Sequence, residues 1–306
     1  METAIWGAGS IGLLWGARLA LAGQDPLIIT RTKEQQEHLL RNGLHLRHRS
    51  GRLDTVKVRV EWAGKDLGAF DRILLTVKQT AIPSLIPRIV EQCRQGAMLY
   101  LLQNGMGAER WMVDKISPSQ LWRGSTTEGA LREGDTIVVH TGEGETYFGP
   151  FTHHVNDQEL RWINTLKEHG LPVEYDPFIH LRTWKKLAIN CVINPLTALL
   201  QIKNGALVDQ KDFTIWLERI LAEVVCVAKS DRIVLDKEEL KEKVRHVCEQ
   251  TAQNRSSMAE DLRLGHPSEI DFINGFIVTM GREKGVKTPF NQELLERVHR
   301  AEGKYG

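Results

Sequence analysis

A lysine and two asparagines recur at helical spacing in an otherwise apolar stretch of this sequence, and together they could bind an oxygen and give it a proton. The stretch is WKKLAINCVINPLTALL, residues 184–200. Lys186, Asn190 and Asn194 follow one another at intervals of four residues, so they share one face of a helix. Lys185 is rotated by about 100° from that face, and we expect it to be solvated. Polar groups on an apolar helix cost stability unless they are partnered, so this face needs an explanation.

Pro195 adds to the unusual character of the stretch. It removes an N–H group that would have bonded the carbonyl of Cys191, which loosens the helix beside Asn194. On these residues alone the face is either a polar seam satisfied between helices or one wall of a substrate cleft. In a cleft, the Lys186 ammonium would bond an oxygen where negative charge develops, and partial burial would lower the pKa of the lysine.

A second set of polar residues lies in NRSSMAEDLRLGHPSEIDFINGF, residues 254–276. Asn254 and Ser257 are spaced to share a helix face. Glu269 stands one and two helical turns before apolar residues of a packing stripe, and a carboxylate there needs a partner such as a substrate hydroxyl or a lysine. The alternative is a charge at a helix start, favoured by the macrodipole, because a Pro-Ser pair precedes it. Position supports the two interpretations of Glu269 equally.

The start of the chain indicates which fold must hold these side chains. TAIW, residues 3–6, reads as a short strand, and apolar residues at helical spacing follow the glycine block GAGSIG. This is the context in which a G-x-G-x-x-G pattern binds a dinucleotide, with the phosphates at the helix N-terminus. Gly7 would allow the tight turn, Gly9 the approach of a pyrophosphate, and Gly12 close packing of helix on strand. The predicted phosphate-binding loop consists of Gly7, Ala8, Gly9, Ser10, Ile11 and Gly12. The alternative is a glycine-rich turn without a ligand.

The end of the next strand indicates which nucleotide is bound. PLIIT, residues 26–30, leads directly into Arg31. An acid near this position would hold the ribose of an unphosphorylated cofactor, whereas Arg31 and Lys33 suit a 2′-phosphate. A pair of solvated loop cations is the alternative, but their position favours contact with a cofactor. We therefore predict NADPH/NADP+ as the cofactor.

Further strand and helix units extend a doubly wound pattern. RILLTVK, residues 72–78, and AMLYLL, residues 97–102, read as buried parallel strands separated by a helix. Because ligands lie beyond the carboxyl ends of such strands, Lys78 and Asn104 are placed to meet one. The Asn-Gly pair at 104–105 could mark a hairpin, but the helical pattern of AERWMV after it argues against that. TIVVHT and ETYFG are expected to form an antiparallel appendix.

From about residue 177 the pattern changes to long helical periodicity with few strand signals. The predicted fold class is α/β, with an N-terminal Rossmann-type doubly wound domain over residues 1–176. An all-α substrate domain follows over residues 177–306. A nucleotide domain favours the cleft interpretation of the polar helix face. The hypothesis is then a reductase in which NADPH gives hydride to a carbonyl carbon and Lys186 gives a proton to its oxygen.

Composition excludes several other classes of function. The chain has 306 residues, of which 42% are apolar and 26% charged, as in an ordinary soluble globular protein. A net charge of +1 gives no reason to expect a nucleic-acid or membrane partner. The four cysteines lack metal-binding spacing and fit a reducing compartment, so no metal is expected. The apolar N-terminal run follows an acid and is interrupted by Arg18, which argues for a cytoplasmic protein over a secreted or membrane-spanning one.

Six motifs together resemble the ketopantoate reductase (2-dehydropantoate 2-reductase) family over essentially the whole chain. They are GAGSIG, TVK at 76–78, QNGMG at 103–107, KLAINCVINPLTA at 186–198, NRSSM at 254–258 and SEIDFINGF at 268–276. The last three are highly specific, and the first is not. The resemblance implies an oxidoreductase that reduces 2-dehydropantoate to (R)-pantoate with NADPH, a step toward pantothenate and coenzyme A. A homodimer is left open.

The resemblance also implies roles for individual residues. Lys186 would be the general acid, and Glu269 would help to position substrate and lysine and lie near the cofactor. The implied substrate contacts are Asn104, Asn190, Asn194, Asn254 and Ser257, with Asn104 also near the nicotinamide. The implied cofactor contacts are the glycine loop, Arg31 and Lys78. Glu128 stands where the family often has a histidine, which leaves its role open.

Two other functions remain alternatives. One is a dehydrogenase of similar architecture that acts on another small keto or hydroxy acid, since β-hydroxyacid dehydrogenases also use a lysine with an asparagine one helical turn later. The other is an NADP(H)-binding sensor without turnover, against which the presence of Lys186 and Glu269 argues. Activity on other acids would select the first, and nucleotide binding without oxidation would select the second.

Overall fold

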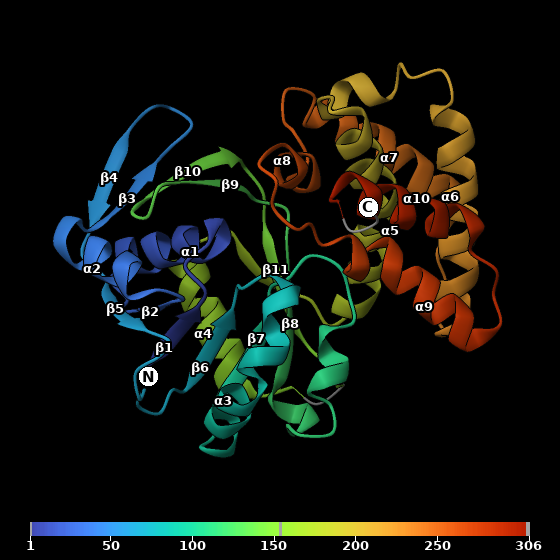
Figure 1. Cartoon of the computed structure of the whole chain (residues 1–306). Coiled ribbons are helices and arrows are strands. Elements are labelled where there is room, and N and C mark those ends of the chain that lie inside the picture. Colours follow the sequence, from blue (N-terminus) through green and yellow to red (C-terminus); the bar gives the residue numbers. More distant parts are fainter. Residues whose placement is uncertain (1, 153–154, 304–306) are drawn as a thin grey trace. The chain divides into compact units, whose positions relative to one another are not determined.

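The computed structural model describes residues 2–152 and 155–303 of the chain (Figure 1). These residues form two compact units. The first unit comprises Met1–Gln103 and Ala108–His180, and the second comprises Asn104–Gly107 and Leu181–Gly306.

This division differs from the expected domains 1–176 and 177–306 in two respects. It falls later, after residue 180, because the backbone N–H of Asp176 donates to Phe148 O at 2.8 Å and ties the connecting segment to the first unit. The short loop Asn104–Gly107 belongs to the second unit because Met106 N donates to Phe272 O at 2.8 Å. Contacts of single loops such as these have no signature in hydrophobic periodicity.

The first unit is built on an eight-stranded sheet in the order β12-β11-β8-β7-β6-β1-β2-β5. Its strands are β1 (Thr3–Trp6), β2 (Leu27–Thr30), β5 (Arg59–Trp62), β6 (Arg72–Leu75), β7 (Met98–Leu101), β8 (Leu121–Thr126), β11 (Thr146–Pro150) and β12 (Val173–Tyr175). Neighbouring strands run parallel except β8 and β11, which are antiparallel. The chain leaves β1 for β2 on one side and returns to β6 on the other, so a topological switch point, where doubly wound folds bind ligands, lies between β1 and β6.

Helices cover both faces of this sheet. They are α1 (Ser10–Leu21), α2 (Lys33–Asn42), α3 (Ile82–Arg94) and α4 (Asp157–Glu168), with short 3₁₀ helices η1 (Gln79–Ala81), η2 (Ala108–Trp111) and η3 (Pro118–Gln120). Within β1, Ile5 packs in the apolar cluster that contains residues of α1 and α4, whereas Ala4 and Trp6 pack in the cluster that contains residues of α3. Alternate side chains of the central strand thus meet different helices. The predicted Rossmann-type α/β fold is confirmed.

A second, four-stranded sheet in the order β4-β3-β10-β9 packs against α1, so that α1 lies between two sheets (Figure 1). Its strands are β3 (Leu44–Arg47), β4 (Leu53–Val56), β9 (Gly129–Glu133) and β10 (Ile137–Gly142). The expected antiparallel pairing of TIVVHT with ETYFG is wrong, because β10 pairs with β3 and β9 while β11 joins the main sheet. The ring of Phe148 in β11 packs against Trp15 and Tyr100, and this apolar contact draws the strand into the main core.

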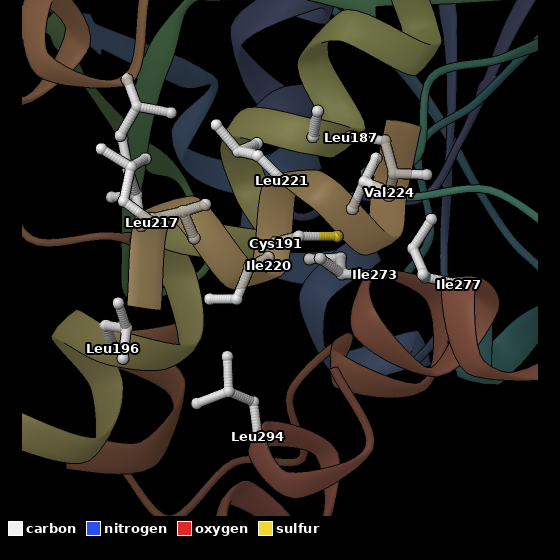
Figure 2. Packing of buried hydrophobic residues seen from close by; sticks show 14 of the residues in the cluster. Leu187, Cys191, Leu196, Leu217, Ile220, Leu221, Val224, Ile273, Ile277 and Leu294 are labelled. Atoms are coloured by element: carbon white, nitrogen blue, oxygen red, sulfur yellow. The ribbon is translucent and has the colours of Figure 1, made fainter. Parts of the chain in front are cut away.

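In its described residues, the second unit contains helices joined by loops and turns, and no strand. Its helices are α5 (Ile179–Leu200), from residue 181 onward, α6 (Phe213–Ser230), α7 (Lys237–Gln250), α8 (Ser257–Arg263), α9 (Asn274–Lys284) and α10 (Pro289–Ala301), with the 3₁₀ helices η4 (Asn204–Leu207) and η5 (Ile270–Phe272). Apolar side chains from α5, α6, α9 and α10 form one core around the fully buried Cys191 (Figure 2). None of the helices in the described part of the chain combines the length and apolar content that crossing a bilayer requires.

Lys185 corrects one expectation about α5. Its ammonium donates to Glu239 of α7 at 2.8 Å, and 27% of its side chain is exposed. The prediction that Lys185 is solvated is therefore wrong, because helix packing brings a carboxylate of α7 within its reach. The structure thus separates the two adjacent lysines, one paired on the outside of the unit and the other in the candidate site.

Candidate active site

The glycine loop between β1 and α1 has the shape of a phosphate cradle. Gly7 has φ +123°, a conformation that side chains rarely adopt. A Cβ on Gly12 would lie 1.8 Å from Gly7 O, so the helix packs on the turn as closely as the motif requires. By contrast, a Cβ on Gly9 would meet no described heavy atom within 4 Å. The space over Gly9 and the first-turn amides of α1 fit the pyrophosphate of a dinucleotide.

Two polar side chains that the sequence analysis did not identify hold this loop. Thr76 Oγ1, just after β6, donates to Gly7 O at 2.8 Å, and Gln35 Nε2 of α2 donates to Ala8 O at 3.0 Å. Ser10 Oγ accepts from the backbone N–H of Arg132 at 3.0 Å, which fixes the hydroxyl at the helix start. These contacts join segments far apart in the chain, so no local spacing could have indicated them.

The cations expected at the ribose end lie at the surface of the first unit. Arg31 and Lys33 are exposed directly after β2, and neither forms an ion pair with a carboxylate among the described residues. Thr32 between them caps α2 by accepting from Gln35 N. Lys78 is exposed beyond the end of β6, next to the switch point. Three cationic side chains thus border the carboxyl edge on which a phosphorylated nucleotide would lie.

Lys186 and Asn104 meet within the second unit. Lys186 Nζ donates to Asn104 Oδ1 at 3.0 Å, and both residues are half-buried. Burial lowers the pKa of Lys186 to about 8, although the charge of Glu269 acts to raise that pKa. A lysine with a pKa near neutrality can both carry a proton at pH 7 and give it up.

A glycine brings Asn104 to this place. Gly105 has φ +80°, and a Cβ there would lie 2.2 Å from Phe272 O, so only glycine fits between the loop and η5. The neighbouring N–H of Met106 donates to the same carbonyl at 2.8 Å. The loop that carries Asn104 is therefore fastened to the segment that follows Glu269.

Asn190 and Asn194 are the other two residues of the polar face of α5, and they are not paired as they would be in a satisfied polar seam. Asn194 is buried, with 7% of its surface exposed, and Asn190 is half-buried. Neither side-chain amide forms a hydrogen bond with another of the described residues. Buried amides in a polar seam would be paired, so their open donors and acceptors favour the cleft interpretation.

The NRSSM segment lies near the Asn194 end of the face. Ser256 Oγ is 2.7 Å from Thr197 Oγ1 of α5 and also accepts from Ala259 N, so it caps α8. The expectation that Asn254 and Ser257 share a helix face is wrong, because α8 begins only at Ser257 and Asn254 lies in the preceding turn. Ser256 caps the N-terminus of α8 by accepting from the backbone N–H of Ala259, so the helix begins directly after it. Asn254, before Ser256 in the chain, is half-buried, and Ser257, after it, is exposed.

Glu269 is half-buried directly before η5, five residues ahead of α9. It is therefore not in the first turn of an α-helix, which removes the basis of the macrodipole interpretation and corrects its expected place on a helix face. Backbone contacts hold the segment, with Ser268 N donating to Glu302 Oε1 at 2.8 Å. The carboxylate charge acts on Lys186 instead.

Glu128 belongs to a different cluster, in the first unit. Its carboxylate forms a short contact with the guanidinium of Arg18 in α1 and lies 3.5 Å from His140 Nε2. Burial raises the pKa of Glu128, and the Arg18 guanidinium opposes that shift. Glu128 thus joins α1, the helix that follows the glycine loop, to the strands around His140 within the first unit.

Comparisons with known proteins identify the family of the chain. A family model described as ketopantoate reductase PanE/ApbA matches residues 3–153, and the model of its C-terminal part matches residues 179–302. The 2-dehydropantoate 2-reductases of Vibrio cholerae and Archaeoglobus fulgidus are each 33% identical to this chain, over 97% of both sequences. That of Bacillus subtilis is 31% identical over 94% of this chain and 92% of its own.

Solved structures resemble the whole chain as well. A ternary structure of D-mandelate dehydrogenase with NADH and anilino(oxo)acetate has a TM-score of 0.93 at 25% identity, over 99% of both chains. A PanE/ApbA family ketopantoate reductase from Ralstonia eutropha has a TM-score of 0.89 at 27% identity, also over 99% of both chains.

The glycine loop yields a prediction that separates binding from folding. Gly9→Ala adds a methyl group to the open space of the cradle, so it should weaken NADPH binding while the midpoint temperature of unfolding changes little. Gly12→Ala forces a methyl group onto Gly7 O and should lower that temperature strongly. Fluorescence titration with NADPH and thermal unfolding measure the two effects. Tight NADPH binding by Gly9→Ala would show that the pyrophosphate lies elsewhere.

Proposed function

The chain belongs to the ketopantoate reductase family, and we propose that it reduces 2-dehydropantoate to (R)-pantoate with NADPH as the hydride donor. The observation that carries the proposal is the hydrogen bond from Lys186 Nζ to Asn104 Oδ1. The helix face that carries Lys186 also carries the unpartnered amides of Asn190 and Asn194. That arrangement offers one proton donor and several orienting groups to a small polar molecule. It is what the reduction of a ketone beside a carboxylate needs.

The cofactor would be held by residues of the first unit. The glycine loop fits its pyrophosphate, Arg31 and Lys33 suit the 2′-phosphate, and Lys78 lies at the switch point. When bound, NADPH supplies the hydride that adds to the carbonyl carbon. The protein's own residues must then orient the ketone, exclude water from it and protonate its oxygen.

Lys186 is the proposed proton donor. With a pKa of about 8 it is mostly protonated at pH 7, by roughly ten to one. Its ammonium would bond the ketone oxygen as charge develops there and then give up the proton. Asn104 accepts from the lysine and fixes its direction, while the carboxylate of Glu269 keeps the lysine charged against the effect of burial.

The remaining polar groups suit the rest of the substrate, which carries a carboxylate, a ketone and a hydroxyl. Asn190 and Asn194 have free amide N–H groups that can donate to the carboxylate. Glu269 can accept from the hydroxyl, and Ser257 and Asn254 flank the end of the face. We assign these five residues to substrate binding, with Glu269 also close to the reacting groups.

A second candidate function rests on the likeness to D-mandelate dehydrogenase. Oxidation of a 2-hydroxy acid such as mandelate is the reverse of 2-keto-acid reduction, so the same lysine could serve it. This candidate differs in the size of the group beside the ketone and in the use of NADH. A substrate and cofactor panel therefore separates the two.

We also assign the protein to the cytoplasm. Its four cysteines are free thiols, three of them buried, and such thiols persist in reducing compartments.

The function predicts that Lys186→Ala loses turnover but keeps the cofactor. With ketopantoate and NADPH, kcat should fall by about 10²- to 10⁴-fold because the general acid is gone, while NADPH binding is unchanged. Lys185→Ala is the matched control, since Lys185 pairs with Glu239 outside the site and its loss should leave turnover near that of the wild type. Absorbance of NADPH follows both reactions. Normal turnover of Lys186→Ala would exclude this mechanism, and a preference of the wild type for aromatic 2-keto acids would select the second candidate.

A pH profile tests the charge of Lys186. The rate of reduction, measured as kcat/KM at saturating NADPH, should fall as pH rises through about 8, because the donor is then deprotonated. Glu269→Gln removes the charge that raises the pKa of Lys186, so the falling limb should move to lower pH. Movement to higher pH in that variant would contradict the assigned electrostatics.

Cofactor preference tests Arg31. Arg31→Ala should weaken NADPH binding by about 10- to 100-fold through loss of a charged contact to the 2′-phosphate, and should leave NADH binding almost unchanged. Arg41→Ala, an exposed arginine at the other end of α2, is the control. Equal weakening of both cofactors would show that Arg31 does not read the phosphate, and a wild-type preference for NADH would contradict the NADP assignment.

A further inference from the structure

The carbonyl of Cys191 lacks its ordinary partner inside α5. In an α-helix this carbonyl would accept from the N–H four residues later, but that residue is Pro195, which has no N–H. Cys191 is fully buried in the core of the second unit (Figure 2), so water cannot replace the missing donor at low cost. A donor must come from another element.

Asn274 supplies it. Asn274, the first residue of α9, is fully buried, and its Nδ2 donates to Cys191 O at 3.0 Å. The second proton of the same nitrogen goes to Asn291 Oδ1 at 3.0 Å. Both partners are acceptors, which settles the orientation of the Asn274 amide. One side chain thus stands in for a backbone N–H.

The chain of bonds continues to a buried carboxylate. Asn291 Nδ2 donates to Glu223 Oε2 of α6 at 2.7 Å, and Glu223 also accepts the backbone N–H groups of Phe290 and Asn291 at 2.8 and 2.9 Å. The carboxylate therefore holds the N-terminus of α10, where the helix dipole favours it. Asn274 of α9 donates to α5 and to α10, and Asn291 of α10 donates in turn to α6, so the bonds join four helices.

The position of Asn274 gives this network a functional consequence. Asn274 follows Glu269 by five residues, and between them η5 holds the loop of Asn104 through Phe272 O. Cys191 lies between Asn190 and Asn194 on the helix that carries Lys186. The bond from Asn274 to Cys191 O is thus a direct tie between the segment of Glu269 and the helix of Lys186.

We propose that Asn274 is a positioning residue, whose amide replaces the donor missing at Pro195 and so holds the Glu269 segment against the Lys186 helix. The functional part of this inference rests on the proposed reductase activity. The hydrogen bond itself, and its effect on Lys186, do not require turnover.

The first test is a thermal double-mutant cycle. Asn274→Ala should lower the midpoint temperature of unfolding by roughly 3–10 °C, because Cys191 O is left without a donor. Pro195→Ala restores a backbone N–H for that carbonyl, so the same substitution in its background should cost about half as much. Additive losses would overturn the inference. Asn274→Ser serves the same cycle if the alanine variant does not fold.

The second test reads the position of Glu269 through Lys186. The rate at which an amine-reactive acylating reagent modifies Lys186 at different pH values, followed by peptide mass spectrometry, gives its pKa without substrate. The charge of Glu269 acts to raise this pKa. In Asn274→Ala the pKa should fall by about half a unit or more as the segment loosens, and kcat should fall with it.

Asn291→Ala is the matched control for both readouts. Asn291 is an equally buried asparagine in the same network, but its loss leaves the bond to Cys191 O in place. It should lower the unfolding temperature yet leave the pKa of Lys186 unmoved. Equal pKa shifts in the two variants, or none in Asn274→Ala, would reduce Asn274 to a structural role. If the wild type reduces no keto acid, the proposed function fails while the thermal cycle and the acylation profile still decide the inference.

Discussion

The site depends on keeping a lysine charged where water is scarce. Burial lowers the pKa of Lys186 and the charge of Glu269 raises it, and the balance of the two effects is a pKa of about 8. Either effect alone would give a poor donor, since a solvated lysine holds its proton too tightly and a fully isolated one would be neutral. The surrounding structure sets this balance through the loop of Asn104, the turn of Gly105 and the segment before α9.

Close backbone approach is the second requirement, and glycine meets it in both units. Gly12 lets α1 sit on the turn after β1, and Gly105 lets the Asn104 loop sit on η5. In each case a Cβ atom on the glycine would clash with a carbonyl oxygen of the other segment. Side chains then lock the backbone, as Thr76 and Gln35 do for the glycine loop.

Local patterns predicted most of the fold and the shared face of the site. These patterns are local, and a single sequence is enough to detect them. They are the glycine block, the buried strands and the spacing of Lys186, Asn190 and Asn194. The pairing of β10 and β11, the partner of Lys185 and the place of Glu269 depend on which distant segments meet. Asn274 shows the limit most clearly, because its role appears only when the carbonyl freed by Pro195 is found beside it.

The bond between Asn274 and Cys191 O has a consequence for how such sequences can change over time. A proline in the middle of a core helix leaves a backbone carbonyl without its donor, and here a side chain from another helix supplies one. The two positions are therefore coupled: loss of the asparagine should cost more stability while the proline is present than after the proline has been replaced. A substitution at one position changes which substitutions are permitted at the other, although neither residue touches the reacting atoms.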